Sequence, residues 1–299
     1  MEALGAFTCN ICGERNSSSA PLTDREVPTC STCRSSMRYR SIVLALSRAL
    51  FGLDLPLPVF PKLKSVRGLG ISDSETYSIP LESVFSYTNT FYHREPFLDL
   101  LAPNESDFGK FDFILCSEVL EHVPTPVERA FATLSKLLKP TGVLIFTVPY
   151  SLDPESVEHY PGLTESVFAQ VGGQMVLVGR LENGEYRVFD KLTFHGGAGS
   201  TLEHRVFSEK SLPRYLSEAG FPIVQFESNG SREFGVAFPD PWSLPIVAKR
   251  APFALSAHGV TELVEQLAVQ RAALNNSQWL RLGRALGLGP KLPKAPAKS

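Results

Sequence analysis

The stretch FDFILCSEVLEHVPTPVERAFATLSKLLKPTGVLIFTVPY, residues 111–150, decides the fold of this 299-residue chain. Residues 111–116 form a short apolar run, which is typical of a strand buried on both faces of a parallel sheet. Residues 143–148 form a second run of the same kind. We therefore expect two buried parallel strands in this stretch.

A helix is expected between these two runs. Thr125 can cap it, Pro126 suits the first helical position, and Glu128 stands three residues after the Thr. Pro140 and Gly142 end the helix after a basic last turn. The apolar positions follow the spacing of one helical face: Val127, Ala130, Phe131, Leu134, Leu137 and Leu138.

A strand, helix and strand in this order form a right-handed crossover by strong default. Cofactors of such folds bind at the carboxyl ends of the strands. Glu118, Glu121 and His122 follow the first strand directly. The sequence therefore predicts a polar site at this edge of the sheet.

This segment resembles the fourth strand, following helix and fifth strand of class I S-adenosylmethionine-dependent methyltransferases. The resemblance is to the branch with a Leu-Glu-His-Val turn, here residues 120–123, and a Leu-Lys-Pro-x-Gly helix exit, here residues 138–142. It implies an α/β fold with a Rossmann-like methyltransferase sheet, and S-adenosylmethionine as cofactor. Another Rossmann-like enzyme is the alternative, since a fold alone does not determine function.

The bulk composition is that of an ordinary globular protein, with 43% hydrophobic and 20% charged residues. Because 29 basic residues stand against 31 acidic ones, overall charge gives no case for a nucleic-acid partner. We find no apolar stretch long enough to span a membrane and no signal-peptide pattern. A cytoplasmic location is the expectation.

Four of the five cysteines form two Cys-x-x-Cys pairs with seventeen residues between them. This spacing is typical of a tetrahedral zinc site, and thiolates suit Zn(II). Four thiolates would close the coordination shell, so the zinc is expected to be structural. Two disulfides in an oxidising compartment are the alternative. The predicted ligands are Cys9, Cys12, Cys30 and Cys33.

Three arginines, Arg34, Arg38 and Arg40, follow the last of these cysteines. They could form a phosphate or nucleic-acid patch on the ribbon, or they could pair locally. The sequence leaves both interpretations open.

Composition divides the chain into four parts. Residues 1–40 are a zinc ribbon, and residues 41–61 are a helix followed by a proline-rich connector. Residues 62–250 are the methyltransferase domain, with an insertion at about 151–205. Residues 251–299 are an amphipathic helix, expected to dock on the domain, and a disordered tail. We expect removal of the metal to unfold the ribbon and to leave the main core folded.

The resemblance also implies which residues bind the cofactor. Gly68 and Gly70 occupy the place of the glycine-rich first loop, although Val66 and Ser72 replace the family's acid and third glycine. A second strand at 84–89 would bring Asn89 to the ribose position.

A third strand at 97–100 would bring Asp99 and Leu100 to the adenine position. Cys116, Ser117 and Glu118 end the strand at 111–116 and are expected to line the same site.

The rest of the domain carries further signals. Asn183-Gly184 between two apolar runs predicts a β-hairpin in the insertion, which we expect to cap the cofactor. Residues 196–199 are rich in glycine and could shape a substrate loop or act as a hinge. A helix at 208–219, paired strands at 221–226 and 233–238, and a strand at 246–248 would complete the sheet.

The predicted function is S-adenosylmethionine-dependent methyl transfer to a small hydroxylated substrate, such as a sugar or glycan intermediate. His122 is the first candidate base, followed by His195 and His204, and a structural role is the alternative for each. Two other hypotheses remain: an RNA or protein methyltransferase guided by the ribbon, and a catalytically inactive zinc-ribbon/Rossmann binding module.

Overall fold

A central six-stranded sheet organises the chain, whose computed structural model describes residues 3–21, 24–195, 201–238 and 244–286. The strand order is β15-β16-β6-β5-β3-β4. Four strands run parallel: β3 (Leu63–Ile71), β4 (Phe85–Thr90), β5 (Phe111–Ser117) and β6 (Leu138–Thr147). β16 (Ile246–Lys249) runs antiparallel to β6, and β15 (Ile223–Phe226) runs antiparallel to β16. The predicted α/β class is confirmed, as are the two parallel strands.

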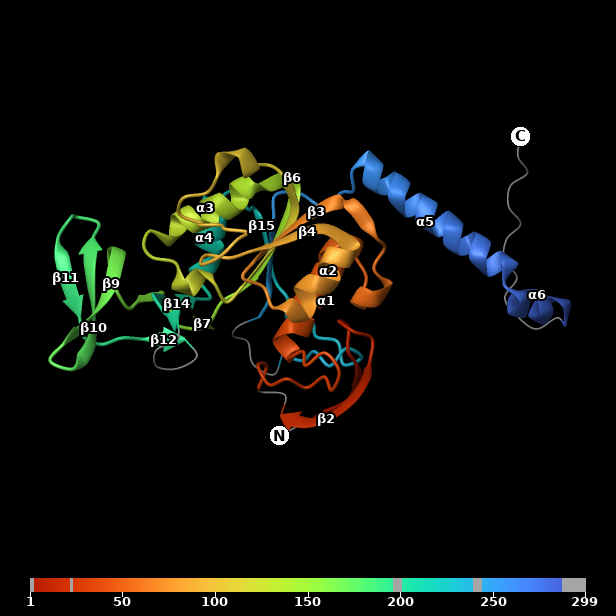
Figure 1. Cartoon of the computed structure of the whole chain (residues 1–299), viewed down its shortest axis with the longest axis horizontal. Coiled ribbons are helices and arrows are strands. Elements are labelled where there is room, and N and C mark those ends of the chain that lie inside the picture. Colours follow the sequence, from red (N-terminus) through yellow and green to blue (C-terminus); the bar gives the residue numbers. More distant parts are fainter. Residues whose placement is uncertain (1–2, 22–23, 196–200, 239–243, 287–299) are drawn as a thin grey trace.

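Helices cover both faces of this sheet (Figure 1). α1 (Met37–Phe51) and α2 (Glu75–Val84) lie on one face, and α3 (Val127–Leu137) and α4 (Leu212–Glu218) lie on the other. Alternation along β5 explains the two layers, because Ile114 packs with α3 and α4 while Phe113 packs with α1 and α2. Every residue of β5 is buried, as its apolar sequence predicted.

The predicted cap of α3 is wrong, although the helix is present. Its N-terminal cap is Pro126, and no side chain caps the first turn. Thr125 instead donates its backbone N–H to the Leu163 carbonyl, so this segment is held by the insertion rather than by a local capping box. Glu128 in the first turn still favours the helix dipole.

The ribbon begins with an antiparallel pair, β1 (Ala3–Thr8) and β2 (Arg15–Pro21). Phe7, Cys9 and Ile11 belong to the same buried cluster as residues of α1, β3 and β5. The Thr8 N–H also donates to the Glu233 carbonyl at 2.7 Å. The ribbon is therefore packed into the core, and our expectation of a separable module does not agree with this packing.

The predicted strand at 97–100 is wrong. Only one isolated bridge, between Phe91 and Phe97, forms in this segment, and the Asp99 side chain accepts from the Leu101 N–H at 2.8 Å. A parallel neighbour needs a crossover of a dozen or more residues, and too few residues follow β4 to provide one.

The predicted strand at 233–238 is also wrong, because β15 pairs with β16. Residues 231–236 form a turn closed by a Ser231 and Val236 bridge. Gly235 lies in this turn at a φ of 62°, and a Cβ there would lie 2.6 Å from the Phe7 ring. Packing of the turn against the ribbon thus replaces the expected strand pairing.

Three small sheets form in and beside the insertion, and two of them have three strands. β7 (Tyr150–Ser151) and β8 (Val157–Glu158) flank β14 (Arg205–Ser208), while β9 (Leu163–Val171), β10 (Gln174–Leu181) and β11 (Tyr186–Phe189) form an antiparallel sheet. The predicted hairpin at Asn183-Gly184 is confirmed by β10 and β11. β9, which pairs with β10, was not predicted from the sequence. The signal was Gly172-Gly173 between the two strands, since both glycines adopt the positive φ values that a tight hairpin requires.

A short pair, β12 (Phe194–His195) and β13 (Thr201–Leu202), completes the insertion. Figure 1 shows β9, β10 and β11 at one end of the molecule, beyond β12 and β14 as seen from the central sheet. We expected this hairpin to cap the cofactor, but it lies away from the central sheet. Gly196 to Gly199, the predicted substrate loop, lie outside the described residues.

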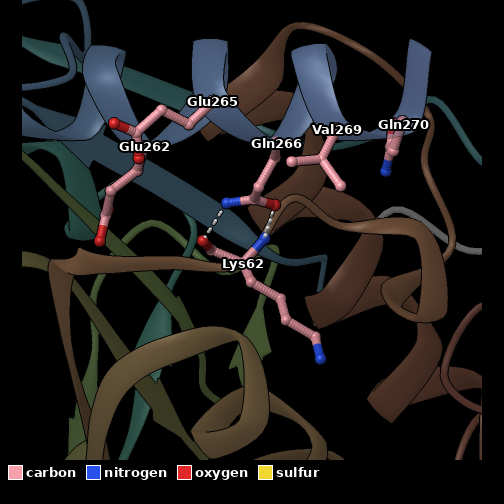
Figure 2. A pocket seen from close by; sticks show the side chains of 6 residues that line it. All are labelled: Lys62, Glu262, Glu265, Gln266, Val269 and Gln270. Carbon is pink, nitrogen blue, oxygen red and sulfur yellow. Dashed lines mark hydrogen bonds between the residues drawn. The ribbon is translucent and has the colours of Figure 1, made fainter. Parts of the chain in front are cut away.

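α5 (Ala257–Asn276) and α6 (Gln278–Ala285) lie at the other end of the molecule (Figure 1). Figure 2 shows that the Gln266 side chain of α5 bonds to the backbone N–H and carbonyl of Lys62. Glu262 of the same helix accepts a hydrogen bond from the Ser65 hydroxyl. Docking is thus limited to the first turns of α5. No helix in the described part of the chain is long and apolar enough to cross a membrane. The tail predicted at 291–299 lies outside the described ranges.

The shared core predicts that a ribbon mutation weakens the whole chain. Phe7 is 5% exposed, so Phe7→Ala should cost about 3–5 kcal/mol of unfolding free energy. Urea unfolding followed by circular dichroism should show one transition, shifted to lower urea. Val59→Ala, at a residue 60% exposed, is the control and should change stability by under about 0.5 kcal/mol. A core midpoint unchanged by Phe7→Ala would contradict the shared core.

Candidate functional site

The carboxyl ends of three parallel strands meet at one edge of the central sheet. Ile71 at the end of β3 pairs with Thr90 of β4 and with Cys116 of β5. Ser117 follows Cys116, and its hydroxyl lies 2.9 Å from the Thr147 hydroxyl at the end of β6. Polar side chains therefore line this edge, where cofactors bind in α/β folds.

The turn after β5 holds an unusual glutamate. Glu118 adopts a φ of 54° and donates its N–H to the Thr147 carbonyl at 2.9 Å. Its Oε2 lies 3.2 Å from Nη2 of Arg25. Its Oε1 is buried and makes no hydrogen bond among the described residues. The edge thus presents a carboxylate oxygen that a ligand could engage.

The N-terminal region contributes cations to this edge. Arg38 of α1 donates from Nη1 to the Ser117 hydroxyl at 2.6 Å and from Nε to Glu26 at 2.8 Å. Together with Arg25, it places positive charge beside the end of β5. Sequence reasoning left Arg38 between a basic patch and local pairing and did not single out Arg25, so it missed this contact, which the packing of the ribbon creates.

Gly68 and Gly70, predicted in a cofactor loop, lie inside β3. A Cβ on Gly68 would lie 2.2 Å from the Phe113 ring, and one on Gly70 would lie 2.1 Å from the Tyr87 hydroxyl. Both glycines therefore make room for rings of the chain itself. The turn comes later, at Ser72, whose φ of 56° is the left-handed conformation that the family's third glycine would adopt easily.

Asp73 follows this turn and was missed by sequence reasoning. Its carboxyl group is buried and accepts from the hydroxyls of Tyr77, at 2.7 Å, and Tyr87. Burial raises its pKa to about 7, despite these two hydrogen bonds. Asn89, predicted at the ribose position, accepts from the Asp73 N–H at 3.0 Å and donates to its carbonyl at 2.8 Å. Asn89 thus holds the turn in place.

The other predicted cofactor residues divide into two groups. Cys116, Ser117 and Glu118 lie at the carboxyl end of β5, as expected. Burial raises the pKa of the Cys116 thiol, which suits a packing or lining role. Asp99 and Leu100 lie on no strand, and Leu100 packs into the core beneath α3 and α4.

The three candidate histidines are not equivalent. The rings of His122 and His195 meet edge to face with centroids 5.6 Å apart. His122 Nδ1 lies 2.7 Å from the Leu202 carbonyl, and burial lowers the His122 pKa. His204 is buried against Tyr160, and burial lowers its pKa to about 3. His122 and His195 therefore form a pair, with a neutral His204 in a separate buried position.

The buried Arg205 joins the insertion to the turn after β5 through hydrogen bonds. Arg205 donates to the carbonyls of Leu120, at 2.9 Å, and Val123, and pairs with Glu158 at 2.6 Å. The His204 N–H also donates to the Glu121 carbonyl at 2.8 Å. The insertion therefore fixes the position of the Leu-Glu-His-Val turn.

The four N-terminal cysteines converge. Sγ of Cys9 and Cys33 are 3.6 Å apart, as are those of Cys12 and Cys30, and all four lie within 4.8 Å of one another. Zn–S bonds of about 2.3 Å put sulfurs about 3.8 Å apart in a tetrahedron. The cysteines are free thiols, so this geometry suits a metal rather than two disulfides.

Two matching turns build this cluster. The Gly13 N–H donates to the Cys9 carbonyl at 2.8 Å, and the Arg34 N–H donates to the Cys30 carbonyl at 3.1 Å. Gly13 and Arg34 both have positive φ values, 81° and 59°. The residue after each Cys-x-x-Cys pair thus turns the chain so that both sulfurs face the same point.

The predicted basic patch does not form as a unit. Arg40 is fully buried, and Arg38 points to Glu26 and Ser117, so only Arg34 is exposed among the three. Local pairing, the alternative interpretation, therefore accounts for two of these arginines.

Two surface hollows lie near the sheet. One of about 460 Å³ lies between Lys62 and α5, at the amino end of β3 and away from the polar edge (Figure 2). Another, of about 370 Å³, lies beside β4 and α2 and is lined by Tyr87, Thr88 and Asn89 among others. The second hollow adjoins the carboxyl end of β4.

An α/β sheet with a polar carboxyl edge defines the Rossmann-like class of cofactor-binding folds. Within that class, the chain belongs to the methyltransferase domain family, whose sequence profile matches residues 61–226, more than half of its length. The predicted enzyme class, an S-adenosylmethionine-dependent methyltransferase, is confirmed by this membership.

Several solved structures resemble the chain. An S-adenosylmethionine-dependent methyltransferase from Clostridium acetobutylicum ATCC 824 is 14% identical, with a TM-score of 0.36, over 71% of this chain and 97% of its own. The sugar N-methyltransferase KedS8 from Streptoalloteichus sp ATCC 53650 is 13% identical, with a TM-score of 0.39, over 72% and 87%.

The CMeT domain of the citrinin polyketide synthase is 13% identical, with a TM-score of 0.35, over 62% of this chain. The match spans about half of that structure, 46% of its length. No curated protein sequence matches the chain.

The buried Asp73 predicts a pH dependence of stability. Its pKa is about 7 in the folded protein against an ordinary 3.8, so the folded state holds the proton more tightly. The contribution of this group to unfolding free energy should therefore fall as pH rises through that interval. The unfolding free energy of Asp73→Asn minus that of wild type should therefore increase by on the order of 1–3 kcal/mol from pH 5 to pH 8.

Urea unfolding at both pH values measures this change. Asp107→Asn, which removes a half-exposed carboxylate paired with Lys110, is the control and should show a much smaller change. If the difference between Asp73→Asn and wild type is the same at both pH values, the carboxyl group of Asp73 is ionised throughout and the interpretation is wrong.

Proposed function

We propose that the chain transfers a methyl group from S-adenosylmethionine, bound across the carboxyl ends of β3, β4 and β5, to a small hydroxylated acceptor. The observation that carries the proposal is the polar edge that these ends form beside the Leu-Glu-His-Val turn. The methyl carbon exchanges its bond to sulfur for a bond to the acceptor, and the acceptor loses one proton.

The charges at this edge complement those of the cofactor. S-adenosylmethionine carries a carboxylate, an ammonium and a sulfonium group. Arg38 beside Ser117 could receive the carboxylate, and the partnerless Oε1 of Glu118 could face a cationic group. Residues at the end of β5 thus fit the methionine portion, with Cys116 as lining.

The adenosine portion is assigned to the ends of β3 and β4. The hollow beside Asn89 lies on that side, so we propose that Asn89 contacts the ribose. From the family resemblance alone, we propose that Asp99 and Leu100 flank the adenine. Gly68 and Gly70 contribute indirectly, because they let Tyr87 and Phe113 pack closely under the turn at Ser72.

Removal of the acceptor's proton is assigned to His122. Its lowered pKa keeps the imidazole neutral near pH 7, and a hydrogen bond from Nδ1–H to the Leu202 carbonyl leaves the lone pair on Nε2. His195 lies against the same ring and is assigned to acceptor positioning. We propose a structural role for His204, whose ring is buried against Tyr160.

Two features favour a small acceptor over nucleic acid or protein. β12 and β13 contact His122 from the insertion, which narrows the approach to this edge. The ribbon arginines Arg38 and Arg40 point inward instead of forming a basic surface. Aromatic rings in the insertion, such as the stacked pair Phe168 and Phe194, suit a sugar-like molecule.

We also propose that Cys9, Cys12, Cys30 and Cys33 hold one structural Zn(II). The sulfur separations fit tetrahedral coordination, and all four positions would be filled by thiolates. The zinc would support folding and would take no part in methyl transfer.

Calorimetric titration with S-adenosylmethionine tests the cofactor site. We expect one binding site per chain and, for Glu118→Gln, about tenfold weaker binding through loss of a charge-assisted contact. Glu128→Gln, on the exposed face of α3, is the matched control and should bind as wild type does. Absence of detectable binding by the zinc-loaded wild type would refute the methyltransferase proposal and favour the catalytically inactive zinc-ribbon/Rossmann module.

Transfer of a labelled methyl group identifies the acceptor class. Incubation with a set of sugars and glycan intermediates should give methylated product, whereas RNA and protein should remain unlabelled. Label found only in RNA or protein would replace the small-acceptor proposal with the ribbon-guided alternative.

Zinc removal should destabilise the whole chain, because the ribbon shares its core. Metal analysis of Cys30→Ser should show one zinc fewer than wild type, and its thermal unfolding midpoint should fall by several degrees in a single transition. Cys116→Ala is the control for metal content, since its thiol lies in β5, and it should retain the zinc. Equal zinc in Cys30→Ser and wild type would refute the four-cysteine site.

A further inference from the structure

A second group of metal-ligating side chains lies beside the polar edge. Glu121 and His122 belong to the 3₁₀ turn Leu120–His122, and His195 belongs to β12. One ligand atom from each of the three lies within 4.8 Å of the others. Segments more than seventy residues apart in the sequence thus bring a carboxylate and two imidazoles together.

The carboxylate of Glu121 is the unusual member of this group. The residue is 0% exposed, and neither Oε1 nor Oε2 makes a hydrogen bond within the described part of the chain. Its nearest basic atom is His122 Nε2, 3.7 Å from Oε1, which is too far for a hydrogen bond. Burying a carboxylate without a partner is costly, so this position calls for a cation.

Both imidazoles are oriented by a second set of groups. His122 Nδ1 contacts the Leu202 carbonyl at 2.7 Å, and His195 Nδ1 contacts Glu203 Oε2 at 3.3 Å. Hydrogen bonds of this kind, from the far ring nitrogen to a carbonyl or carboxylate, orient metal-bound histidines in proteins. This orientation favours Nε2 as the ligand atom of each ring.

The orienting groups are themselves held in place. Leu202 pairs with Phe194 across β12 and β13, so the group that orients His122 lies on the ladder that carries His195. Glu203 is 9% exposed, and its other oxygen lies 3.1 Å from His159 Nε2. This second set of contacts fixes both rings independently of any ligand.

We propose that Glu121, His122 and His195 bind one divalent transition-metal ion. Two nitrogens and one oxygen suit Zn(II), Mn(II) or Fe(II), with bonds of about 2.0–2.2 Å that small side-chain rotations would allow. Three protein ligands leave coordination positions open. The metal site itself does not depend on the methyltransferase proposal. Only the suggestion that the acceptor's oxygen occupies an open coordination position of the metal rests on that proposal.

An ion at this place changes how the acceptor loses its proton. Coordination would lower the pKa of a bound hydroxyl group, so its proton could pass to solvent water without a separate base. His122 would then serve as a ligand, and its Nε2 would be unavailable as the base. The acceptor's negative oxygen would face the end of β5, where the methyl donor is proposed to bind.

Metal content of the full chain tests the proposal. Wild type is incubated with Zn(II) and Mn(II), dialysed, and measured for total metal, counting both elements. We expect two equivalents per chain: one at the four cysteines and one at Glu121, His122 and His195. Glu121→Gln and His195→Ala should each retain one equivalent. His258→Ala, whose side chain on α5 is 74% exposed, is the control and should retain two.

Thermal unfolding gives an independent measure that also shows whether each variant folds. Added Mn(II) should raise by several degrees the midpoint of wild type and of His258→Ala that hold only one equivalent of zinc, and should leave Glu121→Gln prepared in the same way unchanged. Without added metal, Glu121→Gln should be at least as stable as wild type, because it removes a buried unpaired carboxylate.

Two results would overturn the proposal: a single metal equivalent in wild type, or two equivalents in both Glu121→Gln and His195→Ala. Calorimetry with S-adenosylmethionine separates this failure from that of the methyltransferase proposal. Cofactor binding with a single metal equivalent would refute only the metal site, whereas two equivalents without cofactor binding would refute only the cofactor site.

Discussion

The buried guanidinium of Arg40 constrains the whole N-terminal half. Its side chain is fully buried, donates to the carbonyls of Ser35 and Gly235 at 3.0 and 2.9 Å, and lies 4.5 Å from the centre of the Phe7 ring. No carboxylate among the described side chains pairs with it, and the four nearby cysteine sulfurs would supply negative charge as thiolates on a bound metal. Because an uncompensated buried charge is costly, the ribbon, α1 and the turn at 231–236 must close together around it.

The same packing brings ribbon charges to the polar edge at the end of β5. The Ser41 hydroxyl donates to the backbone carbonyl of Arg38, one helical turn earlier in α1. The Arg38 guanidinium donates to the Ser117 hydroxyl at the end of β5. Arg25 reaches Glu118. The electrostatic balance at the end of β5 therefore depends on residues that the sequence analysis assigned to a separate ribbon, so the cysteine cluster and the polar edge share one framework.

Sequence patterns predicted the features that depend on neighbouring residues. Buried runs identified β5 and β6, cysteine spacing identified the sulfur cluster, and Asn183-Gly184 identified a hairpin. The prediction of a strand at 97–100 was wrong because the apolar pattern of these residues does not show whether the chain is long enough to cross over to a parallel neighbour. The inward arginines, the pairing of His122 with His195, and the clamp between Asn89 and Asp73 arise from contacts between distant segments, which no local pattern contains.

The contact between Arg40 and Gly235 has a consequence for the order in which the protein can form during synthesis. The cysteines and α1 leave the ribosome early, but the carbonyl that completes the arginine's surroundings is made 195 residues later. Until then the guanidinium must stay hydrated and the ribbon incompletely packed. Closing so long a loop is slow, so the ribbon, although it is translated well before residue 235, reaches its final structure late.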